Sequence, residues 1–179
     1  MKTLTLLRHA KSGWDDPAVR DFDRSLNAKG KRAAAAVGRH WKTLGLTFDH
    51  VVASPALRVV ETLAEVERGY GALARVADRR VYLASAATLL DLVHDFPDGA
   101  ATALLVGHNP GLEDLALLFA ADTDRGTLRD AMEEKFPTAS TAQLTFAVDR
   151  WADVAAKGAA LTLFVRPRDI DPALGPDAD

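Results

Sequence analysis

Cysteine is absent from this chain of 179 residues. Disulfide bonds, thiolate nucleophiles and thiolate metal ligands are therefore all excluded. The sequence also has no apolar run long enough to span a bilayer. Its first residues, MKTLTLLRHAK, contain an apolar segment that is too short for a secretory signal. We therefore expect a cytoplasmic protein without a membrane contact.

An excess of positive charge is also missing. The formal net charge is −3 and the isoelectric point is about 5.9, whereas general nucleic-acid binders usually carry a basic face. We therefore expect no nucleic acid partner. Hydrophobic residues (48%) and charged residues (26%) are balanced as in a folded globular protein. The length fits one domain, which we place at residues 1–166, followed by a flexible tail at residues 167–179 that is rich in proline and aspartate.

Apolar runs typical of strands alternate with segments of helical periodicity along the chain. Strands are predicted at residues 3–7, 50–53, 102–106, 142–148 and 159–165, with a weaker candidate at 80–83. Helices are predicted at about residues 26–44, 54–68, 87–96, 109–119 and 124–134. Ser54-Pro55 and Asn109-Pro110 each combine a capping side chain with proline at the first helical position, which is typical of a helix start. Gly45 is expected to end the first helix.

This alternation predicts an α/β fold, a three-layer sandwich around a mostly parallel sheet of about six strands. The last two strands lack a helix between them, so at least one strand is expected to be antiparallel. Ligands of open α/β sheets bind at the carboxyl ends of the parallel strands. Functional residues are therefore expected just after those strand ends.

Three of the predicted strands are followed at once by residues suited to binding phosphate. They are Arg8 and His9 after the first strand, Ser54 and Arg58 after the second, and Gly107, His108 and Asn109 after the third. Arginine presents a fork of donors that matches phosphate oxygens, and helices that begin nearby add unpaired N–H groups. The three junctions together favour an anion-binding site.

A histidine in such a site has two interpretations. A neutral imidazole nitrogen can attack phosphorus and form a covalent phosphohistidine that water later hydrolyses, while flanking cations stabilise the transferred group. Alternatively, His9 is a capping or surface histidine, Arg58 a solvated helix residue and His108 part of a tight turn. The pattern alone leaves both interpretations open. Under either one we expect neither a metal ion nor a cofactor.

Leu7-Arg8-His9-Ala10-Lys11-Ser12 resembles the Arg-His-Gly/Ala signature of the histidine phosphatase superfamily, the proteins with a phosphoglycerate mutase-like fold. Residues 54–58 with Glu61-Thr62 resemble the second arginine motif of that family, and residues 107–111 resemble its second histidine motif. The order and spacing of these motifs fit over about residues 2–166. The resemblance implies a phosphatase in which His9 is the nucleophile and in which the phosphate pocket is lined by Arg8, Arg58 and His108.

Two features favour the short, phosphohistidine phosphatase branch of this family. The chain has little room for the insertions that cover the pocket in mutase and acid-phosphatase members. Residues 81–87, where mutase-type members place a proton-donating glutamate, contain no carboxylate, and an alkoxide leaving group needs such an acid more than phosphohistidine does. Arg24 resembles a loop arginine of the short branch, and further substrate contacts are implied for Ser12 and Asn109.

The leading hypothesis is a metal-independent phosphatase that removes phosphate from phosphohistidine on a protein. Its expected partners are a phosphorylated protein and phosphate or other small anions. One alternative is a small-molecule phosphomonoesterase whose acid is His108 or a loop aspartate, namely Asp15, Asp16, Asp21 or Asp23. Another is a non-catalytic module that binds phosphate or a phosphoprotein. Mutase activity is the least favoured, because the glutamate and the longer substrate-gripping segments are missing.

Overall fold

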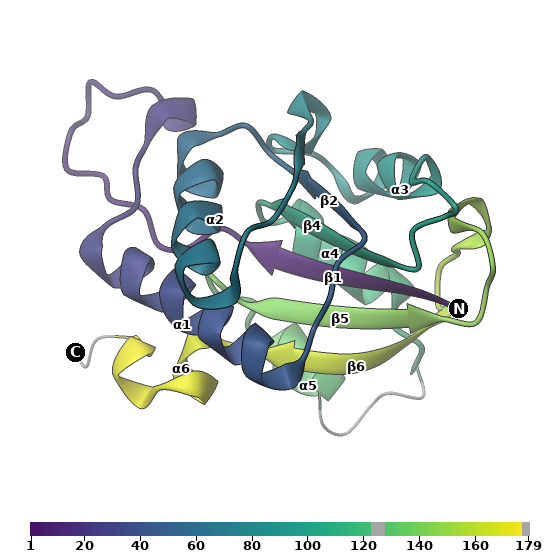
Figure 1. Cartoon of the computed structure of the whole chain (residues 1–179). Helices are drawn as coiled ribbons and strands as arrows, with labels where there is room; N and C mark the ends of the chain where they lie inside the picture. The colour runs from purple at the N-terminus through teal and green to yellow at the C-terminus, as the bar shows by residue number, and fades with distance from the viewer. Residues whose placement is uncertain (123–127, 177–179) are drawn as a thin grey trace.

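The computed structural model describes residues 1–122 and 128–176. Their strands form one sheet in the order β3-β2-β4-β1-β5-β6 (Figure 1). Neighbouring strands are parallel from β3 to β1, whereas β5 runs antiparallel to both β1 and β6. The predicted α/β class with a mostly parallel sheet is therefore confirmed. The strands are β1 (Lys2–Arg8), β2 (His50–Ala53), β3 (Val76–Ala77), β4 (Thr102–Gly107), β5 (Thr141–Phe146) and β6 (Ala159–Val165).

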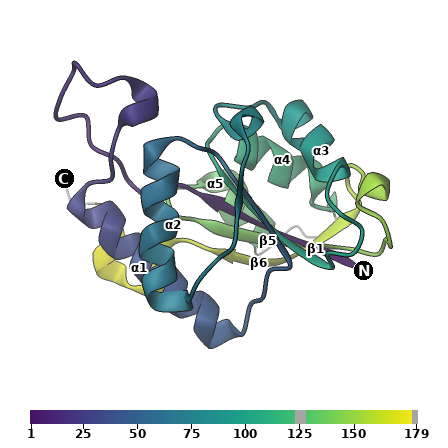
Figure 2. The ribbon, with the colours of Figure 1, turned by 45° about the horizontal axis from the view of Figure 1, so that its top comes forward.

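Helices cover both faces of the sheet and form the predicted three layers (Figures 1 and 2). They are α1 (Ala28–Leu44), α2 (Leu57–Tyr70), α3 (Ala86–His94), α4 (Gly111–Phe119), α5 (Leu128–Glu134) and α6 (Pro167–Ile170). Short 3₁₀ turns lie at Asp21–Asp23, Arg79–Val81, Trp151–Asp153 and Pro172–Leu174. Among the residues that the structure describes, no helix combines the length and apolarity needed to cross a bilayer.

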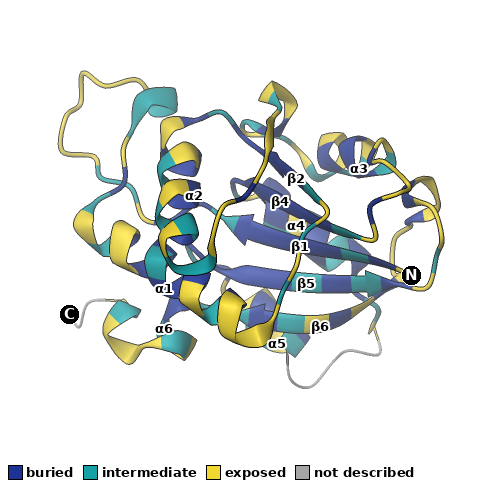
Figure 3. Ribbon diagram, viewed as in Figure 1, coloured by how far each residue is buried: buried dark blue, intermediate teal, exposed yellow. Residues whose placement is uncertain are grey.

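The core consists of two buried clusters, one on each face of the sheet. Successive side chains of a strand point to opposite faces, so Leu104 and Val106 of β4 pack under α1 and α2 while Leu105 packs under α3 and α4. Figure 3 shows the central strands β1, β2, β4 and β5 buried over most of their length. Helix α1 approaches α2 so closely that a Cβ on Gly38 would lie 2.1 Å from the carbonyl oxygen of Val66. Only glycine permits that approach.

Most predicted elements are confirmed within about two residues. Strands lie where residues 3–7, 50–53, 102–106, 142–148 and 159–165 were predicted to form them. Helix α1 ends at Leu44, and Gly45 follows it in the left-handed conformation at φ 69°. Helix α5 covers the described part of the helix predicted at 124–134, whose first residues, 124–127, lie outside the described residues.

The weak strand predicted at residues 80–83 is wrong. Residues Arg79–Val81 form a 3₁₀ turn, and the edge strand β3 lies just before it. The side chain of Asp78 accepts a hydrogen bond from the backbone N–H of Arg80 at 2.9 Å. This capping contact bends the chain away from the sheet, because aspartate stabilises a turn by bonding the backbone two residues ahead.

The described part of the segment predicted as a flexible tail, residues 167–176, contains regular structure. Helix α6 and the following 3₁₀ turn place Ile170 and Leu174 against the cluster beneath α1. These two apolar side chains are four residues apart and anchor a segment that is otherwise rich in proline and aspartate. Arg166 and Asp169 cap α6, since the Arg166 N–H donates to the Asp169 carboxylate at 2.9 Å.

Candidate active site

His9 lies directly after β1 at the carboxyl edge of the sheet, and only 7% of its surface is exposed. Its backbone N–H donates to the carbonyl oxygen of Gly107 at 3.0 Å, so the pairing of β1 with β4 holds the residue in place. Its Nδ1 lies 2.7 Å from the carbonyl oxygen of Ala10. A carbonyl oxygen can only accept, so Nδ1 carries the proton and the lone pair is on Nε2. The Nε2 atom is therefore the ring nitrogen with a free lone pair.

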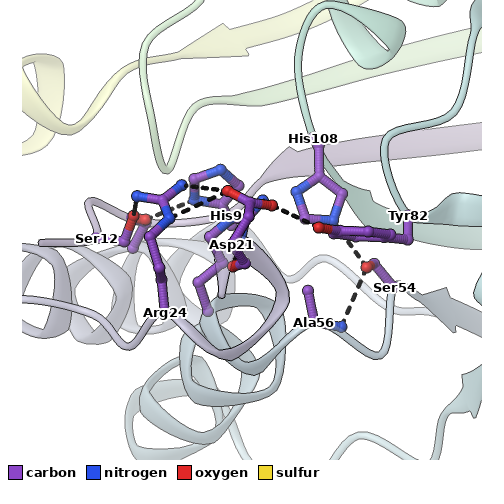
Figure 4. A network of polar contacts seen from close by, with 10 residues as sticks. His9, Ser12, Asp21, Arg24, Ser54, Ala56, Tyr82 and His108 are labelled. Carbon is purple, nitrogen blue, oxygen red and sulfur yellow. Dashed lines mark hydrogen bonds and ion pairs between the residues drawn. The ribbon is translucent and has the colours of Figure 1, made fainter. Parts of the chain in front are cut away.

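His108, which follows β4, lies beside His9 with 5.3 Å between the ring centroids. Its Nε2 is 2.7 Å from Oγ of Ser54, the first residue after β2. The edge of the Tyr82 ring packs against the imidazole at a centroid distance of 5.4 Å. Figure 4 shows these side chains converging from separate elements. Residues from all three predicted junctions thus meet at one place.

Both imidazoles are neutral near pH 7. Burial lowers the pKa of His9 to about 4; the hydrogen bond to Ala10 opposes this shift, and the positive charges of Arg58, Arg8 and Arg24 add to it. Burial, followed by the charge of Arg58, lowers the pKa of His108 to about 3. A neutral imidazole keeps the lone pair that attack on phosphorus requires. The surrounding arginines therefore supply positive charge without the histidines having to carry any.

Arg58 lies in the first turn of α2 with 2% of its surface exposed. Its Nη1 donates to the backbone carbonyl of Asp21 at 2.7 Å, and its Nη2 donates to the Asp21 carboxylate at 3.0 Å. The same carboxylate accepts from the Tyr82 hydroxyl at 2.5 Å and from Arg24 Nε at 3.1 Å. Burial would raise the pKa of Asp21, but these hydrogen bonds outweigh it and lower the pKa to about 2. A carboxylate anion therefore sits beside the cations that would bind phosphate.

Arg8 and Asn109 are held together by one backbone carbonyl. Arg8 Nη1 donates to the oxygen of Phe136 at 2.9 Å, and Asn109 Nδ2 donates to the same oxygen at 3.1 Å. Asn109 Nδ2 also donates to the Glu113 carboxylate at 3.1 Å. Arg8 Nε and Asn109 Oδ1 are buried and have no hydrogen-bond partner among the described residues.

The loop between β1 and α1 brings Arg24 to the site. Arg24 Nη1 donates to Ser12 Oγ at 2.8 Å, and the guanidinium lies 3.5 Å from the centre of the Trp14 ring. This stacking and the contact with Asp21 hold Arg24 among the site residues, and Figure 4 shows Arg24 beside Ser12 and Asp21. In the part of the chain that the structure describes, no group of three or more His, Asp or Glu side chains could hold a metal ion.

Comparison with known proteins agrees with this geometry. Residues 4–80 match the model of the histidine phosphatase superfamily (branch 1). An uncharacterised protein of Mycobacterium tuberculosis is 37% identical over 164 residues, which cover 90% of this chain and 100% of that protein. The chain belongs to the histidine phosphatase superfamily.

Solved structures agree with this assignment. A structure assigned as the phosphohistidine phosphatase SixA of Nakamurella multipartitia superposes with a TM-score of 0.79 at 32% identity, covering 93% of this chain and 96% of that one. A structure assigned as SixA of Agrobacterium tumefaciens superposes with a TM-score of 0.78 at 28% identity, covering 93% of this chain and 98% of that one. The predicted short branch of the superfamily and the phosphatase class are therefore confirmed.

In this histidine phosphatase all seven predicted site residues lie in or beside one cluster. His9, Arg58 and His108 line it directly, and Arg8 adjoins it. Ser12 and Asn109 reach it only through their neighbours Arg24 and Arg8. Their roles in catalysis remain proposals.

The two helices begin one to two residues later than Pro55 and Pro110, the expected first helical positions. Helix α2 begins at Leu57 and α4 at Gly111. The polar side chains are instead used by the site, because Ser54 contacts His108 and Asn109 contacts the Phe136 carbonyl. The capping pattern in the sequence therefore identified Ser54 and Asn109, whose side chains form contacts within the site.

Sequence reasoning missed Tyr82 and gave no role to Thr62, which it named only as part of the second arginine motif. Tyr82 lies in the stretch that was searched for a carboxylate, and an isolated tyrosine just before a helix was the available signal. Thr62 donates to the Arg58 carbonyl at 2.6 Å and accepts from the Ala10 N–H at 2.9 Å. It therefore ties the loop after His9 to helix α2.

Proposed function

We propose that this histidine phosphatase removes phosphate from phosphohistidine on a protein through a covalent intermediate on His9, without a metal ion. The observation that carries the proposal is the state of His9: buried, neutral, and protonated on Nδ1 by its contact with Ala10. Its Nε2 lone pair is available beside the guanidinium groups of Arg8 and Arg58. The SixA assignments of the similar structures support the same substrate class.

The first step transfers the phosphoryl group to His9. The Nε2 lone pair forms a bond to phosphorus while the P–N bond of the substrate breaks, and the electron pair of that bond leaves with the substrate imidazole, which takes a proton from solvent water. Arg8 and Arg58 hold the equatorial oxygens, where negative charge is concentrated in the transition state. Water then attacks phosphorus, the electron pair of the new N–P bond returns to Nε2, and phosphate is released.

The site offers little to a leaving group that needs a strong acid. The Asp21 carboxyl, with a pKa of about 2, carries no proton near pH 7, so the alternative in which it protonates an ester oxygen loses this candidate. Residues 81–87 supply no carboxylate either. Phosphohistidine suits such a site because its imidazole ring takes a proton from water near neutral pH and then leaves as a neutral group, whereas an ester oxygen without an acid leaves as a strongly basic alkoxide.

One observation favours a small-molecule phosphomonoesterase as the second candidate. The Tyr82 hydroxyl lies in the site, and burial together with the Asp21 carboxylate raises its pKa. The phenol therefore keeps its proton near pH 7 and is placed to donate it to an ester oxygen. Tyr82→Phe separates the two functions: ester hydrolysis would fall, whereas phosphohistidine hydrolysis would be retained.

The test compares phosphate release from a phosphohistidine-bearing protein and from p-nitrophenyl phosphate. Wild type and His9→Ala are assayed with His40→Ala as the matched control, since His40 lies on α1 outside the cluster. We expect faster turnover of phosphohistidine than of the ester, lost in His9→Ala and kept in His40→Ala. Quenching with acid-free denaturant and intact-mass analysis would detect the phosphorylated enzyme.

Each other outcome assigns a different function. Faster hydrolysis of the ester would make the protein a small-molecule phosphatase. Phosphate binding without release from either substrate would make it a binding module. Turnover that survives in His9→Ala would refute His9 as the nucleophile.

A further inference from the structure

A cavity adjoins the catalytic cluster at the same edge of the sheet, on the side of β5 and β6. Its volume is about 300 Å³, at the lower end for a site that binds a small group. Its walls come from the loop after β1, the start of α1, the segment before β5 and the chain after β6. The basic residues that line it are Arg8, Lys11, Lys29, Lys135, Arg166 and Arg168.

The charge of this basic cavity is one-sided. No aspartate or glutamate is among its described lining residues, although the whole chain has more acidic than basic residues. Two carboxylates lie near one wall: Asp169 is 3.0 Å from Arg166, and Glu134 also acts on the charge of Arg166. A third carboxylate, Glu113, acts on Arg8. Three carboxylates against six basic residues leave the cavity with an excess of positive charge. A concave surface lined by one sign of charge concentrates ions of the opposite sign.

Arg8 connects the basic cavity to the nucleophile. It lines the cavity and directly precedes His9 in the chain. The backbone N–H of Ala139 donates to the carbonyl oxygens of both Arg8 and His9, at 3.1 and 3.0 Å, which holds the two residues in a fixed arrangement. The buried Arg8 Nε has no hydrogen-bond partner among the described residues. Arg8 is therefore the residue that the cavity shares with the catalytic cluster.

Resting on the proposed function, we propose that the basic cavity binds acidic side chains that flank the phosphohistidine of the partner protein. The cavity offers lysines and arginines for carboxylates, and Ala33, Pro137 and Leu174 form apolar walls for the methylene groups of a glutamate. This site selects the substrate, whereas the His9 cluster carries out the reaction. A phosphohistidine in neutral surroundings would be a poorer substrate.

The test uses two peptides with one phosphohistidine each, flanked by glutamates in one and by glutamines in the other. Lys11 and Lys135 are exposed and line the cavity, so the variant is Lys11→Gln with Lys135→Gln. The control, Lys31→Gln with Lys42→Gln, removes the same charge from exposed positions of α1 outside the cavity. For wild type we expect kcat/KM to be about tenfold higher for the acidic peptide at low salt, as two or three exposed ion pairs provide.

The preference for the acidic peptide should disappear in the Lys11/Lys135 variant and persist in the Lys31/Lys42 control. It should also shrink as salt rises, because exposed pairs are screened. Equal kcat/KM for both peptides in wild type, or an equal loss in the control, would overturn the proposal.

A binding measurement keeps this test separate from the proposed function. Calorimetry with His9→Ala and the unphosphorylated glutamate peptide does not require turnover. Peptide binding that is lost with Lys11→Gln and Lys135→Gln supports the cavity as the site for acidic side chains. If neither phosphopeptide is hydrolysed, that result refutes only the proposed function. Tighter binding of citrate than of the peptide would assign the cavity to small molecules and overturn the proposal.

Discussion

Replacing Asp21 by asparagine is expected to strengthen phosphate binding, because the Asp21 carboxylate holds the cation that phosphate needs. The pKa of Asp21 is about 2 against an ordinary value of 3.8, and each pKa unit corresponds to about 1.4 kcal/mol of preference for the charged form. The side chain is 37% exposed, so solvent screens much of this, and we assign about 1 kcal/mol to its contacts. Asp21→Asn should therefore tighten phosphate binding about fivefold.

Isothermal titration of phosphate into the apo-protein measures this effect. The matched control is Asp23→Asn, which removes the same charge from the same turn but breaks only a surface pair with Arg20. Asp21→Asn should also lower the free energy of unfolding without phosphate, because Arg58 is left buried with less compensation. The stability from Asp21 is present above pH 3.8 and is lost as the pH falls towards 2.

An unchanged or weaker phosphate affinity in Asp21→Asn would refute the competition. It would mean that Asp21 orients Arg58 for phosphate instead of opposing it. An equal gain in Asp23→Asn would show that only the overall charge of the loop matters.

Three further outcomes follow from the geometry. In NMR titrations the His9 and His108 ring signals should shift with midpoints near pH 4 and pH 3, and a midpoint near 6.5 would contradict the burial argument. The free energy of unfolding should also fall between pH 6.5 and 4, because the unfolded chain binds protons that the folded protein does not. Gly38→Ala should cost about 1–3 kcal/mol in denaturant unfolding, whereas Gly99→Ala, whose Cβ meets nothing within 4 Å, should cost little. Phosphatase activity should survive EDTA, and its loss would contradict the metal-free mechanism.

The centre of the site could be predicted from the sequence because it depends on strand ends. β1 and β4 contain the short leucine-rich runs predicted at residues 3–7 and 102–106, and His9 and His108 follow these strands directly. In a parallel sheet such ends lie at one edge whatever the strand order. The convergence of the two histidines could therefore be predicted from the positions of the strands alone. Arg58 could be predicted because it lies near the start of α2, the helix that follows β2.

The remainder of the site depends on chain segments without periodicity. Asp21 and Arg24 reach the cluster through the loop after β1, and Tyr82 reaches it through a 3₁₀ turn that resembled a strand in the sequence. Their positions are set by individual hydrogen bonds, which no apolar pattern encodes. The packing of Ile170 and Leu174 was hidden in the same way, because two apolar residues are too few to reveal a helix among prolines and aspartates.

In the proposed reaction, the short contact between His9 Nδ1 and the Ala10 carbonyl would also determine the regiochemistry. With Nδ1 occupied as a donor, phosphate can be attached only to Nε2, so the enzyme would form the tele isomer of phosphohistidine and not the pros isomer. The two isomers differ in their NMR spectra and are distinguished by isomer-specific antibodies. The hydrogen bond would thus leave an identifiable chemical mark on the enzyme during each catalytic cycle.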